Sequence, residues 1–231
     1  MSIRPVTTSS LATPTTEGAG VHLHRVFGFG ETAPFDPFLM MDDFRNDDPA
    51  AYEKGFPWHP HRGIETITYV LRGSVEHADS LGNKGTLGDG DVQWMTAGSG
   101  IIHQEMPTGN AAGQMHGFQL WANLPRDEKM CTPRYQDVKA GDIASLTDDD
   151  GTHIRVIAGD YRGYRGPIDG IDTDPAYLDI TLPANVRKRF PFDTRRQGFA
   201  YVFEGSASFG NAATPFGVNV EKEFAGEEMK I

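Results

Sequence analysis

Between Gly63 and Leu124 the sequence consists of short runs rich in Thr, Ile, Val and Tyr, each closed by a turn that contains glycine. The turns fall at residues 72–73, 80–85, 88–91 and 98–100. β-Branched and aromatic residues favour strands, whereas glycine supplies the backbone conformations that tight turns need. Short strands in this succession predict an antiparallel β-barrel of the jelly-roll type. We therefore expect an all-β protein.

Further strands are predicted on both sides of this region, over residues 20–29, 35–44, 154–159, 177–182 and 199–209. Residues 1–20 are rich in Ser, Thr, Ala and Gly and are expected to form a loosely held arm. Residues 69–74 (YVLRGS) have an echo in residues 201–206 (YVFEGS). This echo predicts a duplicated fold, which we divide into a first domain at residues 1–130 and a second at residues 131–231.

The charge of the chain limits its partners. The formal net charge of the 231 residues is −11, and the basic residues form no long run. These properties oppose direct binding to nucleic acid or to an anionic membrane through phosphate contacts. A single cysteine excludes an intramolecular disulfide, and no stretch approaches the ~20 apolar residues that span a bilayer. We expect a cytoplasmic protein with a small-molecule or protein partner.

Two short motifs carry the candidate chemistry. Residues 59–61 (His-Pro-His) place two imidazoles two positions apart, and residues 103–105 (His-Gln-Glu) do the same with an imidazole and a carboxylate. In a strand, side chains two residues apart project from the same face. Two such pairs on facing strands can hold one ion with three nitrogens and one oxygen. We predict a mononuclear metal site made by His59, His61, His103 and Glu105.

Other arrangements of these residues remain open. The four side chains could instead form a hydrogen-bonded polar cluster without metal, although two pairs in order favour an ion. The pair His22 and His24 has the same spacing but no second half, so we expect it to bind no metal. Among the remaining histidines, His116 is the best placed for a role near the site. Two carboxylates, Glu65 and Asp43, are expected to lie next to the metal ligands or on the surface. Four apolar residues could line a substrate pocket or belong to the core: Phe56, Trp58, Trp94 and Met95.

The sequence around the two motifs resembles the pirin family of the cupin superfamily. The resemblance is carried by HPHRGIET at residues 59–66, DSLGNKG at 79–85, GDVQWMTAG at 90–98, IHQEMP at 102–107 and FQLWANLP at 118–125. It covers residues 21–125 and continues more weakly to residue 210. In other cupins a glutamate of the first motif binds the metal, but Thr66 stands at that position here. The resemblance implies that Glu105 supplies the carboxylate instead.

This resemblance implies a bicupin of two β-barrels, with the metal in the amino-terminal barrel. Pirins continue well beyond the segment at residues 201–210, so the second barrel is expected to be incomplete and to lack metal ligands. The implied ion is Fe(II). Imidazole and carboxylate ligands also accept Zn, Mn, Ni, Co or Cu, so the ligands alone do not select the metal.

Two functions are compatible with the resemblance. The first is a metal-dependent quercetin 2,3-dioxygenase type of enzyme that acts on a small aromatic substrate, a flavonol, with Glu105 as both ligand and catalytic base. The alternative is a non-enzymatic, redox-responsive regulator that binds a transcription factor or a metabolic enzyme. Both need the same four ligands, so the sequence does not separate them. It also predicts no oligomeric state.

Overall fold

The computed structural model describes residues 5–171, 173–193, 195–210 and 229–230. Within these residues the fold is nearly all-β, with three short 3-10 helices, η1 (Ala33–Phe35), η2 (Pro49–Ala51) and η3 (Ala140–Asp142). The chain divides into two compact units. The first is Ala12–Ile143 with Pro167–Pro175, and the second is Met1–Leu11, Ala144–Gly166 and Ala176–Ile231. The all-β prediction is confirmed, whereas the domain boundary at residues 130 and 131 stays a prediction.

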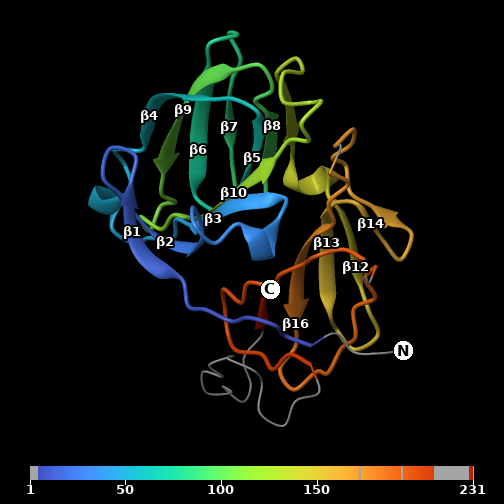
Figure 1. The fold of residues 1–231 in the computed structure, drawn as a ribbon. Helices are drawn as coiled ribbons and strands as arrows, with labels where there is room; N and C mark the ends of the chain where they lie inside the picture. The colour runs from blue at the N-terminus through green and yellow to red at the C-terminus, as the bar shows by residue number, and fades with distance from the viewer. Residues whose placement is uncertain (1–4, 172, 194, 211–228, 231) are drawn as a thin grey trace. The chain divides into compact units, whose positions relative to one another are not determined.

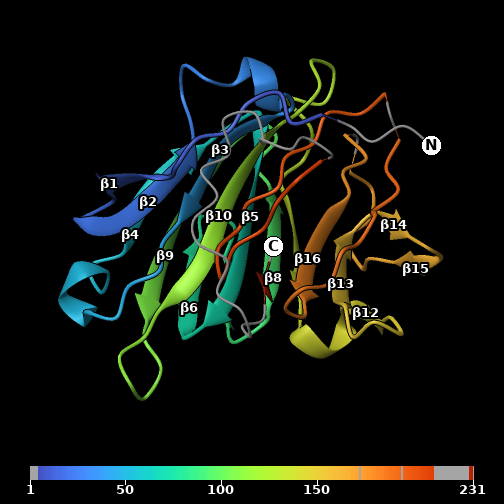
Figure 2. The ribbon, with the colours of Figure 1, turned by 90° about the horizontal axis from the view of Figure 1, so that it is seen from below.

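The first unit contains two antiparallel sheets that face each other (Figures 1 and 2). The larger sheet has the strand order β1-β2-β3-β10-β5-β8-β11 and the smaller has the order β4-β9-β6-β7. Strands of the larger sheet are β1 (Thr13–Glu17), β2 (Val21–Phe27), β3 (Phe38–Asp43), β5 (Ile64–Arg72), β8 (Val92–Thr96), β10 (His116–Asn123) and β11 (Arg134–Val138). Strands of the smaller sheet are β4 (Phe56–His61), β6 (Ser74–Asp79), β7 (Lys84–Leu87) and β9 (Ile101–Thr108).

Three strands of this unit were not predicted from the sequence. Instead of a loose arm, residues 13–17 form β1, which pairs with β2 along its whole length. β7 begins within the turn predicted at residues 80–85 and pairs with β6. β11 lies outside the predicted strands and pairs with β8 in the larger sheet. All three are edge strands with short or polar sequences. β1 and β7 form hairpins with the neighbouring strands β2 and β6, whereas β11 pairs with a strand distant in the chain, so strand pairing rather than hydrophobic pattern determines their formation.

The core of the first unit lies between the two sheets. Along each strand, every second side chain points inward. In β6, for example, Val75 and His77 are buried and Glu76 is exposed. The main apolar cluster contains Val21, Leu23, Phe44, Tyr52, Val70, Val75, Leu87 and Met115. Several inward positions nearer the β4–β9 pair are polar instead. The barrel therefore has an apolar part and a polar part, and the polar part contains the predicted site.

The second unit is built around a four-stranded sheet in the order β12-β13-β16-β17. Its strands are β12 (Ala144–Thr147), β13 (His153–Ala158), β16 (Tyr177–Leu182) and β17 (Met229–Lys230), with a separate pair β14 (Asp160–Tyr161) and β15 (Tyr164–Arg165). The strand predicted over residues 199–209 was wrong, because this segment forms no strand. Gly205 in its middle has φ of +75°, a left-handed conformation that interrupts an extended chain.

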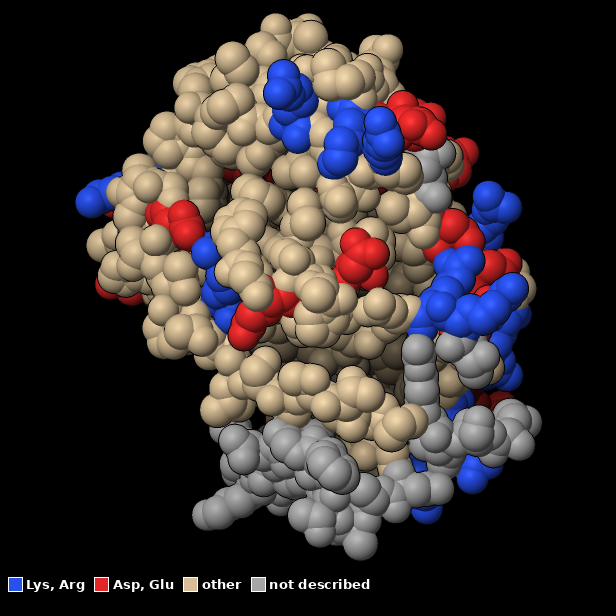
Figure 3. All heavy atoms as spheres, in the orientation of Figure 1, with Lys and Arg blue, Asp and Glu red and all other residues tan. Residues whose placement is uncertain are grey.

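No helix in the described part of the chain is both long enough and apolar enough to cross a membrane. On the face drawn in Figure 3, the described Lys and Arg side chains stand in separate groups among Asp and Glu. The continuous basic band that binds a nucleic-acid backbone is not present on this face.

Asp91, at the start of β8, ties the first unit together beyond its sheets. Its Oδ1 accepts a hydrogen bond from the backbone N–H of Ala140 at 2.8 Å, and its Oδ2 accepts from Gly88 N at 2.9 Å and from Lys139 Nζ at 2.7 Å. Burial raises the pKa of the Asp91 carboxyl, but these donors lower it more, so the pKa lies below its ordinary value of 3.8. The ionised carboxylate is thus the form that the fold stabilises.

Asp91→Asn is expected to lower the free energy of unfolding by about 1–3 kcal/mol at pH 7, because buried donors lose an ionised acceptor. The folded pKa is depressed, so this stabilisation is present above the unfolded pKa of about 3.9 and is lost as pH falls through the lower folded pKa. Urea unfolding from pH 7 to pH 3 measures it. The exposed Asp89→Asn is the control. If the free energies of unfolding of wild type and Asp91→Asn differed by the same amount at pH 7 and pH 3, the account would be contradicted.

Candidate metal centre

Strand register brings the two predicted motifs together. β4 and β9 pair antiparallel, with His59 directly opposite His103. Along β9 the side chains of Ile101, His103 and Glu105 are buried, whereas Ile102 is exposed. The proline between the two histidines of β4 likewise points outward and is exposed. The period of two in each motif therefore places all four predicted ligands on the inward face of the smaller sheet.

The three imidazoles converge on one point. Each offers one ring nitrogen such that the three atoms lie within 4.8 Å of one another, and no other group of three potential ligands is found among the described residues. The shortest separation is 3.0 Å, between Nε2 of His103 and Nε2 of His59. The ring centroids of His61 and His103 are 5.0 Å apart at 66°. The structure therefore brings these three histidines together, and their binding of a metal ion stays a prediction.

The position of the His59 proton can be assigned from its backbone contact. Nδ1 of His59 lies 2.8 Å from the carbonyl oxygen of Pro57. A carbonyl oxygen only accepts, so Nδ1 carries a hydrogen and Nε2 is the ring atom that faces His103. Imidazole nitrogens bind such ions at about 2.1 Å, so two that share an ion lie no more than about 4.2 Å apart. The 3.0 Å separation of the two Nε2 atoms is within this reach.

Electrostatics keep the buried imidazoles neutral. Burial, and then the neighbouring His103 and His59, lower the pKa of His61 to about 4, with Glu105 opposing. Burial, and then His59 and His77, lower the pKa of His103 to about 3, with Asp79 opposing. Metal ions bind neutral imidazole, so at neutral pH these nitrogens are available without the release of a proton.

Glu105 lies next to the histidines but outside the cluster of three donors. Its side chain is 7% exposed, and its Oε1 accepts a hydrogen bond from Thr68 Oγ1 at 2.9 Å. Its charge acts on His61, which places the carboxylate near the imidazoles. The three histidines therefore form the observed cluster, and ligation by Glu105 stays a prediction.

The other histidines and acids considered from the sequence lie elsewhere. His22 and His24 are exposed on β2. His116 lies near Asp43, with Nε2 3.7 Å from Oδ1. The inward histidine nearest to the site is instead His77, which pairs with Glu105 in the register of β6 and β9.

The candidate carboxylates Glu65 and Asp43 are buried, at 2% and 0% exposure, so neither is a surface group. Oε1 of Glu65 accepts a hydrogen bond from Thr96 Oγ1 at 2.7 Å, and Asp43 pairs with Arg45. Neither acid belongs to the cluster of potential metal ligands. Their contacts indicate a structural role.

The aromatic wall of the site comes from a residue that sequence reasoning missed. Trp94 and Met95 are fully buried, and Trp58 is 54% exposed. His61 instead packs against Trp121 of β10, with ring centroids 4.9 Å apart at 75°. Trp121 in turn contacts Phe29, whose exposed ring lies 5.9 Å away. The sequence did contain a signal for Trp121, because Gln119 and Trp121 are two residues apart in a strand and therefore lie on the same face of it.

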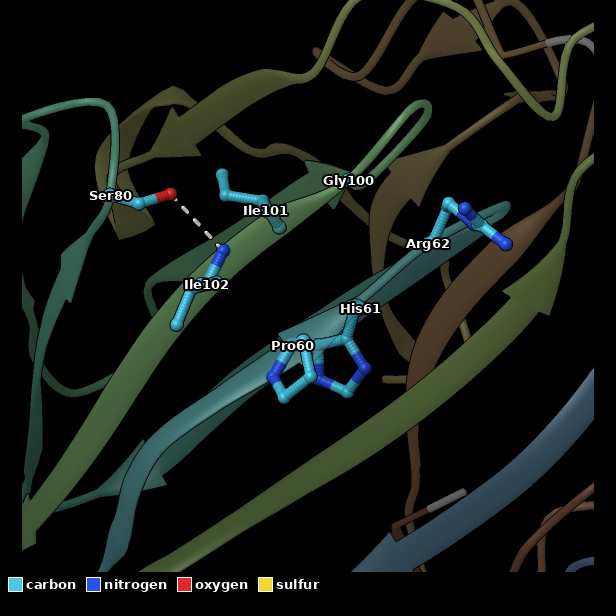
Figure 4. Close-up of a pocket in the computed structure, with 7 residues that line it drawn as sticks. All are labelled: Pro60, His61, Arg62, Ser80, Gly100, Ile101 and Ile102. Carbon is cyan, nitrogen blue, oxygen red and sulfur yellow. Dashed lines mark hydrogen bonds between the residues drawn. The ribbon is translucent and has the colours of Figure 1, made fainter.

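A surface hollow of about 540 Å³ also borders the site. His61 is the one imidazole of the three that lines it, together with Pro60, Arg62, Ser80, Gly100, Ile101 and Ile102. Figure 4 shows Ser80 above β9, where its Oγ accepts a hydrogen bond from Ile102 N at 3.2 Å. Pro60 and Ile102 are exposed on the outer face of the smaller sheet, so this hollow opens mainly on that face and meets the imidazole cluster through His61.

Comparison with known proteins agrees with this geometry. Residues 20–122 match the pirin family. A pirin-like protein of Caulobacter vibrioides is 45% identical over 206 residues, which cover 89% of this chain and 74% of the relative.

Two crystal structures have similar folds. The chain superimposes on the GK1651 protein of Geobacillus kaustophilus with a TM-score of 0.79 and 34% identity, covering 100% of this chain and 86% of the other. It superimposes on quercetin 2,3-dioxygenase from Acinetobacter baumannii with a TM-score of 0.70 and 33% identity, covering 80% and 67%. With its inward histidine cluster on a cupin barrel and its extensive identity to a pirin-like relative, the chain belongs to the pirin family.

Proposed function

We propose that this protein is a metal-dependent dioxygenase that acts on flavonols such as quercetin, with Fe(II) as the resident ion. The observation that carries the proposal is the cluster of three imidazoles on the inward face of the smaller sheet, with one ring nitrogen of each within 4.8 Å of the others. A structural relative of 33% identity is a quercetin 2,3-dioxygenase, which supports the same reaction class. The proposed ligands are His59, His61, His103 and Glu105. A cytoplasmic location stays a prediction.

The donor set suits an open, reactive ion. Three neutral imidazoles and one carboxylate leave a divalent ion with one net positive charge and unfilled coordination positions. When bound, the ion would supply Lewis-acid binding of an anionic substrate oxygen and the redox chemistry with O₂. The protein supplies orientation: Pro57 fixes the His59 tautomer, and Trp121 holds the His61 ring from the side.

Glu105 is the proposed base. A flavonol must lose the proton of its 3-hydroxyl before its oxygen can act as an anion, and a carboxylate within hydrogen-bond reach can accept that proton. Thr68 donates to Oε1 of Glu105, and this oxygen keeps a second lone pair that can take up the proton while the other carboxylate oxygen is left for the ion. The planar ring of such a substrate would lie beside Trp121 and Phe29, whose aromatic faces favour stacking.

Oxygen consumption tests this proposal. Purified protein loaded with iron under argon is mixed with quercetin, and dissolved O₂ and carbon monoxide are then followed after air is admitted. We expect O₂ uptake and equimolar carbon monoxide only with iron, quercetin and air present together. Iron-loaded protein that consumes no O₂ with quercetin would refute the flavonol activity, and the regulatory alternative would then be the one to pursue.

A further inference from the structure

Three polar side chains connect the two sheets beside the proposed metal site. Thr68 of β5 lies opposite Gln119 of β10 in the larger sheet, and Glu105 faces them from β9. Oγ1 of Thr68 is 2.9 Å from Oε1 of Glu105 and 2.8 Å from the amide atom of Gln119 that the structure places as Oε1, so both neighbours stand as acceptors for one hydroxyl hydrogen. Thr68 is 2% exposed, so water has little access to its hydroxyl. Its two hydrogen-bond partners are therefore both protein groups.

Counting hydrogens gives this contact a direction. A threonine hydroxyl has one hydrogen to donate, and an ionised carboxylate can only accept. The hydrogen of Thr68 therefore goes to Glu105, and the neighbour on the other side must donate to Thr68. The oxygen and nitrogen of a glutamine amide are nearly identical in shape, and the hydrogen bonds decide between them. We assign the nitrogen of Gln119 to the position next to Thr68.

We propose that Gln119, Thr68 and Glu105 form a one-way hydrogen-bond chain, in which Gln119 Nε2–H donates to Thr68 and Thr68 O–H donates to Glu105. Thr68 and Gln119 are then positioning residues: they hold the Glu105 carboxylate in the orientation that binds the ion. This inference rests on the proposed metal site, but it does not depend on the identity of the substrate.

The chain acts by restricting Glu105 before any ion arrives. A free glutamate side chain has several rotamers, and metal binding would have to select one of them at a cost in entropy. With Oε1 already bonded to Thr68, the second oxygen is left for the ion. Loss of such a partner outside the ligand set typically weakens metal binding about 10–100-fold. The predicted effect is therefore on metal affinity, before any turnover.

Thr68→Val tests the inference, because valine keeps the shape of threonine and removes its hydroxyl. The matched control is Thr96→Val, since Thr96 is also buried and donates the same kind of hydrogen bond to Glu65, a carboxylate outside the cluster of potential ligands. The measurement is the affinity for Co(II), by competition with a chromophoric chelator, without O₂ or flavonol, together with the visible spectrum of the bound Co(II). Thermal unfolding of the metal-free variants verifies that each still folds.

Thr68→Val is expected to bind Co(II) about 10–100-fold more weakly and with a shifted spectrum, whereas Thr68→Ser and Thr96→Val stay close to wild type. Gln119→Met should weaken binding less. The double variant should be no weaker than Thr68→Val alone, because Gln119 acts through Thr68.

Wild-type affinity in Thr68→Val, or an equal loss in Thr96→Val, would overturn the inference while the metal site still stood. If wild-type protein itself bound no Co(II), the proposed function would fail with it.

Discussion

Replacing His59 with alanine is expected to remove most of the bound metal. Three nitrogens hold the ion in the proposed site, and Nε2 of His59 faces Nε2 of His103 at 3.0 Å. Loss of a direct ligand should weaken binding by more than the roughly 100-fold that marks the upper range for residues outside the ligand set. Metal content by elemental analysis after dialysis is the measurement.

His22→Ala is the control for this experiment. His22 also belongs to a His-x-His pair in a strand, but its side chain is exposed on the outer face of β2. We expect its metal content to equal that of wild type. Equal occupancy in the two variants would mean that the ion binds elsewhere, and the site assignment would be refuted.

Glu105→Gln is expected to lower the turnover of quercetin by about 10²–10⁴-fold, the usual contribution of a general base. The amide keeps the size of the side chain and can still accept from Thr68 O–H, but it cannot take up the proton of a flavonol hydroxyl. Turnover is measured as O₂ uptake per bound iron, so that any loss of iron is separated from loss of the base.

Glu76→Gln is the matched control, because Glu76 lies on β6 one residue before the buried His77 and its side chain is exposed. Its O₂ uptake should be unchanged. If Glu105→Gln keeps wild-type turnover per iron, Glu105 is not the base, although it could still bind the ion.

The sequence predicted the central strands and the histidine cluster because both depend on local patterns. β8 and β16 have the predicted bounds, since runs such as Val92–Thr96 combine strand-forming residues with a glycine turn before them. The His-x-His and His-x-Glu spacings have the period of a strand, so a shared face follows from chemistry alone. The two motifs then meet if β4 and β9 are neighbouring strands.

The contacts that support the cluster could not be predicted in this way. Thr68, Gln119 and Trp121 come from the facing sheet, and which of their neighbours they meet depends on how two sheets pack. β11 likewise depends on a partner strand far along the chain, β8. Gly205 looked compatible with a strand, but its left-handed backbone interrupts the extended segment. Local sequence carries no information on which residues of separate strands come into contact.

The central claim is one metal ion bound by His59, His61, His103 and Glu105. A crystal of the iron-loaded protein, with diffraction data collected on both sides of the iron absorption edge, tests it most directly. We predict a single strong anomalous peak per chain, at bonding distance of about 2.0–2.2 Å from three imidazole nitrogens and one oxygen of Glu105. An anomalous peak elsewhere, or none between these residues in protein shown to contain iron, would contradict the account.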